Sequence, residues 1–413
     1  MGVLAAGEGG ACLVAASLDP DITALAVEGL AVPASTPAGR PVLPVEALPD
    51  DPDADEVRLL AGEPSTRAAV ASWARDRGLT ISRQEPPMLG AADGVTVVAV
   101  SSTRTGSAKT AVARRVVRAL RRSGVPVAVV RHPQSSLLHW PQAAGTHLLH
   151  DPRELSGPRP MDQREELAPL LGAGVPVATG LDPRAMLQEA SSAAQVVVWD
   201  GGGSAAPWVR PDLHIVAVDA MRGPDELSRD RLASADAVVV TKVDSAPEGR
   251  VREWEDLIAD VAPDASLTLA DLPVGVPEGS QLVGRDVVVV EDWPSLGLGG
   301  LKAGAGAVAA RRFRCGVVDP RPFARGAIAR ALRDHPHIGP VIPSLGRTAQ
   351  EQDDLAASVA ATPGQAVLWA SPASPEGLLD AESRPVLRVY PELMEVAGAS
   401  VAEILRPILS PSP

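Results

Sequence analysis

The sequence predicts an α/β protein with parallel sheets, and three observations support this fold class. Apolar runs such as Val95–Val100, Val125–Val130 and Gln195–Trp199 alternate with helical segments. Only 2% of the residues are aromatic in a chain that is 45% hydrophobic, so Ala, Val and Leu must fill the core. With 413 residues, the chain is long enough for two or three domains. Continuous Val-rich strands between helices are typical of sheets buried on both faces.

The first predicted unit, residues 1–92, is a degenerate Rossmann-like domain. We expect strands at Val57–Leu60 and Leu79–Ser82 and a helix at Ser65–Arg77. The Pro-rich segment 33–52 reads as a loop. The glycine cluster Ala6–Gly10 lacks a convincing strand before it, so we assign it no cofactor.

The second and third units are residues 93–280 and 281–413, separated near a Pro- and Gly-rich segment at 272–281. In the second unit we expect a helix at Lys109–Ser123, which has a basic outer face and is ended by Gly124. Residues 137–167 show a less regular pattern. The elements expected after them are helix 182–194, strands 213–218, 237–240 and 286–290, helix 304–313, strand 315–318, helix 323–333, and strands 366–370 and 386–390.

Composition excludes several classes of protein. A formal net charge of −13 disfavours nucleic acid and anionic membranes as partners. No apolar run of about 18 residues is present, and no positive leader precedes the mildly apolar start. Two cysteines are too few for a disulfide framework or a cysteine metal cluster. We therefore expect a cytoplasmic protein without a membrane partner, and we also expect a homodimer.

The strongest motif lies at Ser101–Thr110, where a strand, a loop and Lys-Thr at a helix start form a P-loop arrangement. Backbone amides from Gly106, Ser107 and Ala108 would cradle phosphates, Lys109 would reach the β- and γ-phosphates, and Thr110 would bind Mg²⁺. Ala108 and Ser102 stand where glycines are expected, and alanine is strained at position 108 if that position needs a positive φ. The alternative is an ordinary strand–helix turn.

Two further strand ends carry polar residues. Asp200 follows Val196–Trp199 and is a candidate Mg²⁺ ligand with Thr110, or else a helix cap. Lys242 and Asp244, in Thr-Lys-Val-Asp, match the order of a guanine-reading motif, or else form a solvated turn. Three of the 38 basic residues are lysines, and Lys109 and Lys242 are two of them.

The third unit has a glycine-rich segment around the remaining lysine, Lys302. Glycines, a lysine and a helix start together suit an anion, so we expect a small anionic substrate here. A glycine-rich packing turn is the alternative. The candidate substrate-binding residues are Arg131, His132, Gly299, Gly300, Lys302, Gly304, Gly306, Asp319 and Arg321.

The order of motifs along the chain resembles the cyclic 2,3-diphosphoglycerate synthetase family and its GTPase-like relatives. These motifs are the P-loop, Asp200-Gly-Gly, Thr241–Ser245, Gly299–Gly306, Asp319–Pro322 and His337–Gly346. The resemblance covers about Val95 to Tyr390. It implies ATP-driven closure of an intramolecular phosphoanhydride, with ATP (or GTP) and Mg²⁺ as cofactors. It also implies catalytic roles for Lys109, Asp200, Lys302 and Arg321.

Two other hypotheses stay open. Thr241–Asp244 favours a regulatory or chaperone-like GTPase, whereas the Gly-Lys-Arg set of the third unit favours a synthetase. Ala108 and Ser102 motivate a catalytically degenerate homologue.

Overall fold

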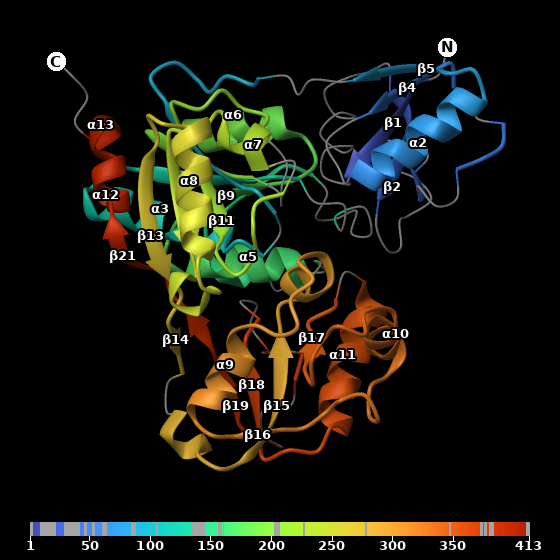
Figure 1. Cartoon of the computed structure of the whole chain (residues 1–413), viewed down its shortest axis with the longest axis vertical. Coiled ribbons are helices and arrows are strands. Elements are labelled where there is room, and N and C mark those ends of the chain that lie inside the picture. Colours follow the sequence, from blue (N-terminus) through green and yellow to red (C-terminus); the bar gives the residue numbers. More distant parts are fainter. Residues whose placement is uncertain are drawn as a thin grey trace.

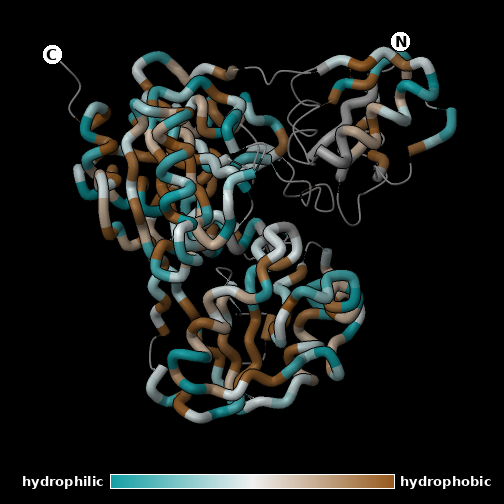
Figure 2. Tube along the Cα trace, viewed as in Figure 1, coloured by the Kyte–Doolittle hydropathy of each residue, from teal (hydrophilic) through white to brown (hydrophobic). Residues whose placement is uncertain are grey.

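In the described residues, the computed structural model has sheets of five, nine and five strands, each largely or wholly parallel, and a two-stranded antiparallel ribbon. Figure 1 shows their arrangement. Hydrophobic residues concentrate along the strands of the second and third sheets (Figure 2). The structure describes residues 3–8, 22–28, 42–44, 48–51, 54–59, 64–83, 88–104, 106–133, 137, 145–155, 159, 161–201, 207–225, 228–276, 279–346, 348–371, 375, 378–379 and 384–409. Within these ranges, no helix has both the length and the apolar character needed to cross a membrane.

The N-terminal sheet has the strand order β3-β2-β1-β4-β5, all parallel, which is the order of doubly wound dinucleotide-binding folds. Its elements are β1 (Val3–Glu8), β2 (Ile22–Glu28), β3 (Val42–Pro44), β4 (Glu56–Leu59), α2 (Pro64–Asp76) and β5 (Thr80–Arg83). The expectation that no strand precedes the glycine cluster was wrong, because β1 ends at Glu8; Gly9 and Gly10 lie outside the described residues. Strand β3 lies inside the segment expected to be a loop.

The middle sheet has the order β21-β13-β12-β11-β6-β10-β7-β9-β8 and is parallel from β13 to β9. Its strands are β6 (Thr96–Ser102), β7 (Val127–Arg131), β8 (His147–Leu149), β9 (Val177–Thr179), β10 (Val196–Asp200), β11 (Leu213–Asp219), β12 (Ala237–Thr241), β13 (Ser266–Asp271) and β21 (Met394–Gly398). Strands β6, β7, β10 and β12 are almost wholly buried, as their Val-rich sequences require.

Helices accompany the middle sheet, and the best defined of them follows β6. Helix α3 (Lys109–Arg122) buries Val112, Val116 and Leu120, which recur every four residues, and presents its arginines outward. It ends at Gly124, whose φ of 76° permits the reversal. The other helical elements are η3 (Pro152–Leu155), α5 (Met161–Gly172), α6 (Pro183–Ala193), α7 (Ser228–Leu232), η4 (Val243–Ser245), α8 (Arg250–Val261), α12 (Val401–Ile404) and α13 (Arg406–Leu409).

The C-terminal sheet is parallel, with the order β16-β15-β18-β19 and β17 also paired to β15. Its elements are β15 (Asp286–Glu291), α9 (Ala305–Arg312), β16 (Gly316–Val317), α10 (Gly326–Asp334), β17 (Ile342–Pro343), α11 (Ala349–Ala361), β18 (Ala366–Trp369) and β19 (Val386–Arg388). The short elements η5 (Gly279–Leu282), the π-helical η6 (Pro294–Leu298) and the two-stranded ribbon β14 (Val274–Gly275) with β20 (Tyr390–Pro391) complete the chain.

The end of the chain returns to the middle sheet. Strand β21 pairs antiparallel with β13, and α12 packs on α3 (Figure 1). The expected third unit was residues 281–413, but its last segment, from β21 onward, packs with the middle sheet rather than with the C-terminal sheet. Ser400 caps α12 and Glu395 accepts from the Val401 amide, contacts that hold this segment in place.

Candidate functional site

The P-loop segment lies between β6 and α3. Gly106 has a φ of 88° and Ala108 a φ of 59°, so position 108 does require the left-handed conformation that disfavours alanine. Thr105 lies outside the described residues. Among the described residues, no side chain caps the N-terminus of α3, so its first amide groups remain available to a ligand.

Four charged side chains meet in the interior beside this loop. Strand β10 lies between β6 and β7, and its register places Asp200 opposite both Val100 and Arg131. Asp200, with no exposed surface, pairs with the Lys109 ammonium and, at 2.8 Å from Oδ2, with Nη1 of Arg131. Arg131 also pairs with Glu166 of α5. Two cations and two carboxylates thus balance, three of them buried and Glu166 partly exposed, as charges taken out of water require.

The protonation of this cluster follows from its geometry. Burial by itself would raise the pKa of the Asp200 carboxyl, but the charges of Arg131 and Lys109 hold it below its usual value. Burial, reinforced by the charge of Arg131, lowers the pKa of the Lys109 ammonium. The contact with Asp200 is therefore what favours the charged form of Lys109.

His132 follows Arg131 and is also buried. Burial and the charges of Arg131 and Lys109 lower its pKa to about 3, so the imidazole is neutral near pH 7. Its ring lies edge-on to Trp199, with 5.8 Å between centroids. Neither ring nitrogen has a hydrogen-bond partner among the described residues. The neutral ring has one N–H donor, so a phosphate contact by His132 would be an uncharged hydrogen bond.

Lys242 contacts the P-loop itself. Its ammonium donates to the Gly106 carbonyl oxygen at 2.6 Å and to Oδ2 of Asp219 at 3.1 Å. The hydroxyl of Thr241 lies 3.3 Å from the Ser107 carbonyl oxygen and 3.0 Å from the Val218 carbonyl oxygen, and these two acceptors compete for its one proton. Asp244 is exposed and accepts from the Ser245 hydroxyl at 3.1 Å. The Thr-Lys-Val-Asp segment therefore supports the loop through Lys242, while the Asp244 carboxylate faces solvent.

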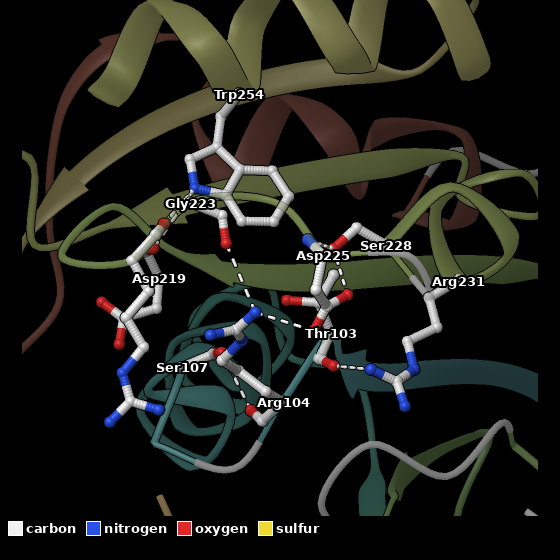
Figure 3. A network of polar contacts seen from close by, with 10 residues as sticks. Thr103, Arg104, Ser107, Asp219, Gly223, Asp225, Ser228, Arg231 and Trp254 are labelled. Atoms are coloured by element: carbon white, nitrogen blue, oxygen red, sulfur yellow. Dashed lines mark hydrogen bonds and ion pairs between the residues drawn. The ribbon is translucent and has the colours of Figure 1, made fainter. Parts of the chain in front are cut away.

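A second set of residues holds the loop from the β11 side and was not predicted (Figure 3). The Arg104 guanidinium pairs with Asp225 at 2.7 Å, the Ser107 hydroxyl donates to the Arg104 carbonyl at 2.9 Å, and Arg231 donates to the Thr103 carbonyl. Asp219 ends a buried strand, as Asp200 does. A carboxylate at the end of a buried parallel strand is the sequence signal that could have predicted a functional role for this region.

The glycine-rich segment of the third unit meets a carboxylate from its own strand. Oε1 of Glu291, at the end of β15, accepts from the amides of Gly304 and Ala307, each at 2.9 Å. A Cβ on Gly304 would lie 2.7 Å from Oε2 of Glu291, so glycine is required for this approach. Burial raises the pKa of Glu291 to about 7, although the amides oppose the shift. The N-terminus of α9 thus holds the protein's own carboxylate.

The remaining predicted substrate residues lie near one another. Lys302 is exposed, and its carbonyl oxygen accepts from the Gly339 amide at 2.7 Å. The Arg321 guanidinium pairs with Asp319 at 3.1 Å and donates to the Ile338 carbonyl. The segment 338–339 therefore joins Lys302 to the Asp319–Arg321 pair.

The P-loop lies close to the glycine-rich segment 299–301 of the third unit. A Cβ built on Gly106 would lie 3.8 Å from both the Gly299 Cα and the Leu301 side chain. A Cβ on Gly300, whose φ is 62°, would lie 3.6 Å from the Arg222 guanidinium. The tertiary structure thus brings the P-loop and residues 299–301 together. Within the described residues, no group of three His, Cys, Asp or Glu side chains is arranged to hold a metal ion.

Known proteins resemble this chain to different degrees, and no family model matches it. Three solved structures are similar in part. They are LpxK from Aquifex aeolicus with ATP (TM-score 0.44, 14% identity, 83% of this chain and 94% of that one), the hydrogenase maturation factor HypB from Archaeoglobus fulgidus (0.25, 15%, 43% and 81%) and a ParA family ATPase from Chlorobium tepidum (0.25, 14%, 45% and 88%). At TM-scores this low, none of these likenesses bears on function.

A sequence relative is more informative. The arginine synthetase ArcE of Thermococcus kodakarensis is 31% identical over 317 residues, which span 75% of this chain and 70% of the relative. Identity at this level over most of both chains, together with the P-loop arrangement in a parallel sheet, shows common descent: this chain belongs to the family of the arginine synthetase ArcE.

Proposed function

We propose that this protein is an ATP-dependent synthetase whose nucleotide binds at the P-loop. The observation that carries the proposal is the uncapped N-terminus of α3, with the Lys109 ammonium buried beside it and paired with Asp200. Free amides and a cation at a helix start suit a polyphosphate.

The residues present fit a Mg²⁺-bound nucleotide. The amides of Gly106–Thr110 would hold the phosphates, and Lys109 would turn from Asp200 to the β- and γ-phosphates. Arg131 would continue to pair with Asp200, so the carboxylate would not be left buried alone. Thr110 and Asp200 would hold the metal ion, whose bound nucleotide supplies an activated phosphoryl group.

The substrate would lie between the P-loop and residues 299–301, with Lys302 and Arg321 supplying positive charge. The Gly106–Gly299 approach supports this position. We propose that Gly304 and Gly306 act by admitting Glu291 to the start of α9 rather than by touching the substrate, because Glu291 accepts the amide of Gly304 and contacts both glycines closely.

Two overall reactions are candidates, and both use ATP to turn a substrate oxygen into a phosphate leaving group. In the first, favoured by the order of motifs, a neighbouring phosphate of the substrate displaces inorganic phosphate and closes a cyclic phosphoanhydride, as in cyclic 2,3-diphosphoglycerate synthetase. In the second, favoured by the relative's name, a nitrogen nucleophile displaces inorganic phosphate from the carbon that bears the phosphorylated oxygen, and the product is arginine. Positioning and charge neutralisation would dominate catalysis in either case.

Calorimetry with ATP and GTP, each with and without Mg²⁺, tests the nucleotide site. We expect Mg²⁺-dependent ATP binding. Binding of GTP alone would favour a regulatory GTPase, and binding of neither nucleotide would favour a degenerate homologue.

Two turnover assays then separate the candidate reactions. One follows phosphate release from ATP with 2,3-diphosphoglycerate, and the other runs in reverse, following ATP formation from arginine, ADP and phosphate. ATP binding without turnover in either assay would contradict both candidate reactions and leave the nucleotide site standing.

A further inference from the structure

The outer face of α3 carries a feature that the proposed reaction does not use. A groove of about 300 Å³ lies between α3 and α5. Four arginines line it, namely Arg114, Arg118, Arg121 and Arg122, and Val117 and Leu170 contribute apolar surface. We call it the α3 groove.

The positive charge of the α3 groove is only partly neutralised within the protein. Arg118 pairs with Glu392 at 3.4 Å, and both side chains are about half exposed. Arg121 donates to the Ala173 carbonyl, which carries no net charge. Arg114 and Arg122 form no ion pair among the described residues. Burial, together with the charge of Arg118, lowers the pKa of Arg114, and the carboxylate of Glu392 opposes this shift.

The spacing of these arginines is unfavourable for the helix alone. Arg114, Arg118 and Arg122 follow one another at intervals of four residues, so like charges are neighbours on one face and repel one another. The negative end of the helix dipole favours Arg121 and Arg122 in the last turn but does not reach Arg114. A net charge of −13 for the whole chain makes this concentration more unusual.

We propose that the α3 groove binds a small, multiply charged anion bearing phosphate or carboxylate groups, at a site separate from the P-loop. The groove is at the lower end of the size range of small-ligand pockets, which suits a compact ligand better than a macromolecule. Guanidinium groups bind phosphate and carboxylate oxygens through paired hydrogen bonds. Two exposed arginines of the groove, Arg118 and Arg122, lie nine and thirteen residues beyond Lys109, or about 13 and 20 Å along the helix. A small ligand bound by these two side chains therefore does not reach Lys109.

The test uses the full-length chain carrying Lys109→Ala, which weakens anion binding at the P-loop. Calorimetry at a constant ionic strength of about 0.15 M measures the Kd of tripolyphosphate, so that general screening is fixed. Adding Arg118→Gln and Arg122→Gln, both exposed positions, should weaken binding at least tenfold. The matched control, Arg330→Gln with Arg333→Gln on the exposed face of α10, should leave the Kd unchanged.

The outcomes decide the proposal. Citrate bound as tightly as tripolyphosphate would identify a site that reads charge in general, and binding of tripolyphosphate alone would identify a phosphate site. Absence of binding to the Lys109→Ala chain, survival of binding in the groove variant, or equal loss in the α10 control would overturn it. So would binding of a polyglutamate peptide without binding of tripolyphosphate.

A second measurement removes the dependence on Lys109→Ala. The native chain should bind one tripolyphosphate more than the groove variant in an otherwise native chain. An unchanged stoichiometry would count against the α3 groove. Failure of ATP to bind the native chain would contradict the proposed function but not this site.

Discussion

The two loops that combine glycines with a lysine ahead of a helix differ in what occupies the helix start. At the P-loop, α3 begins at Lys109 without a side-chain cap, and the lysine is buried against a carboxylate from a neighbouring strand. At the third unit, α9 begins beneath the carboxylate of Glu291, and Lys302 points to solvent. The same residue types thus leave the helix start without a side-chain cap in one place and place a carboxylate on it in the other.

The difference teaches that a glycine-rich motif predicts close approach but not the identity of the approaching group. In α9 the incoming anion is supplied by β15 of the same chain, whereas in α3 the nearest carboxylate, Asp200, contacts the lysine side chain. Four substitutions test this comparison.

Lys109→Ala should produce the largest effect. Loss of a charged contact to phosphate costs about 3 kcal/mol, so the Kd for Mg²⁺-ATP should rise about 100-fold in calorimetry. Lys302→Ala is the matched control at the second loop and should leave ATP affinity within about threefold of the native value. Equal losses in both variants would remove the distinction between the two loops.

Glu291→Gln should change how stability depends on pH. The carboxyl has a pKa of about 7 in the folded chain against 4.5 ordinarily, so the folded state retains a proton that the unfolded state releases. Stability should therefore fall as the pH rises from 4.5 to 7, by at most about 3 kcal/mol, and Glu291→Gln should lack this decline.

Urea denaturation at pH 4.5 and pH 7.5 measures this difference. The exposed variant Asp256→Asn should keep the native profile. A Glu291→Gln profile parallel to the native one would show that the carboxylate is not confined at the start of α9.

Gly306→Ala should destabilise the protein by about 2 kcal/mol through overpacking. The added Cβ would lie 2.6 Å from Cγ1 of Val289 and 3.1 Å from the Ala370 Cβ. Gly172→Ala, at a helical position with open space around it, is the control and should be neutral or slightly stabilising in the same urea titration. Native-like stability of Gly306→Ala would mean that the packing around Glu291 is looser than described.

Ala108→Gly should have the smallest effect and the opposite sign. Relief of the left-handed alanine should stabilise the chain by about 1 kcal/mol, measured by urea denaturation, without weakening ATP binding. A loss of stability would indicate that the loop tolerates alanine without strain and would remove one reason to suspect a degenerate site.

Much of the fold and part of the site followed from local pattern. The buried strands β6, β10, β11 and β12 and helices α3 and α6 matched their expected positions closely, because continuous apolar runs and caps such as Asp182 are local signals. Helix α8 and strand β13 were missed, and α5 began inside the segment expected to be irregular. The return of β21 to β13 depends on pairing between residues more than 120 positions apart, which no local pattern encodes.

The sequence by itself determined which residues are chemically unusual: the three lysines, the strand-end carboxylate Asp200, and the alanine at position 108. Only the tertiary structure decided which charges meet, because a buried carboxylate pairs with whatever donor the strand order and helix packing place within reach. That order joined Lys109 to Asp200 and left Lys302 in solvent, and it placed Glu291 where an external anion had been expected.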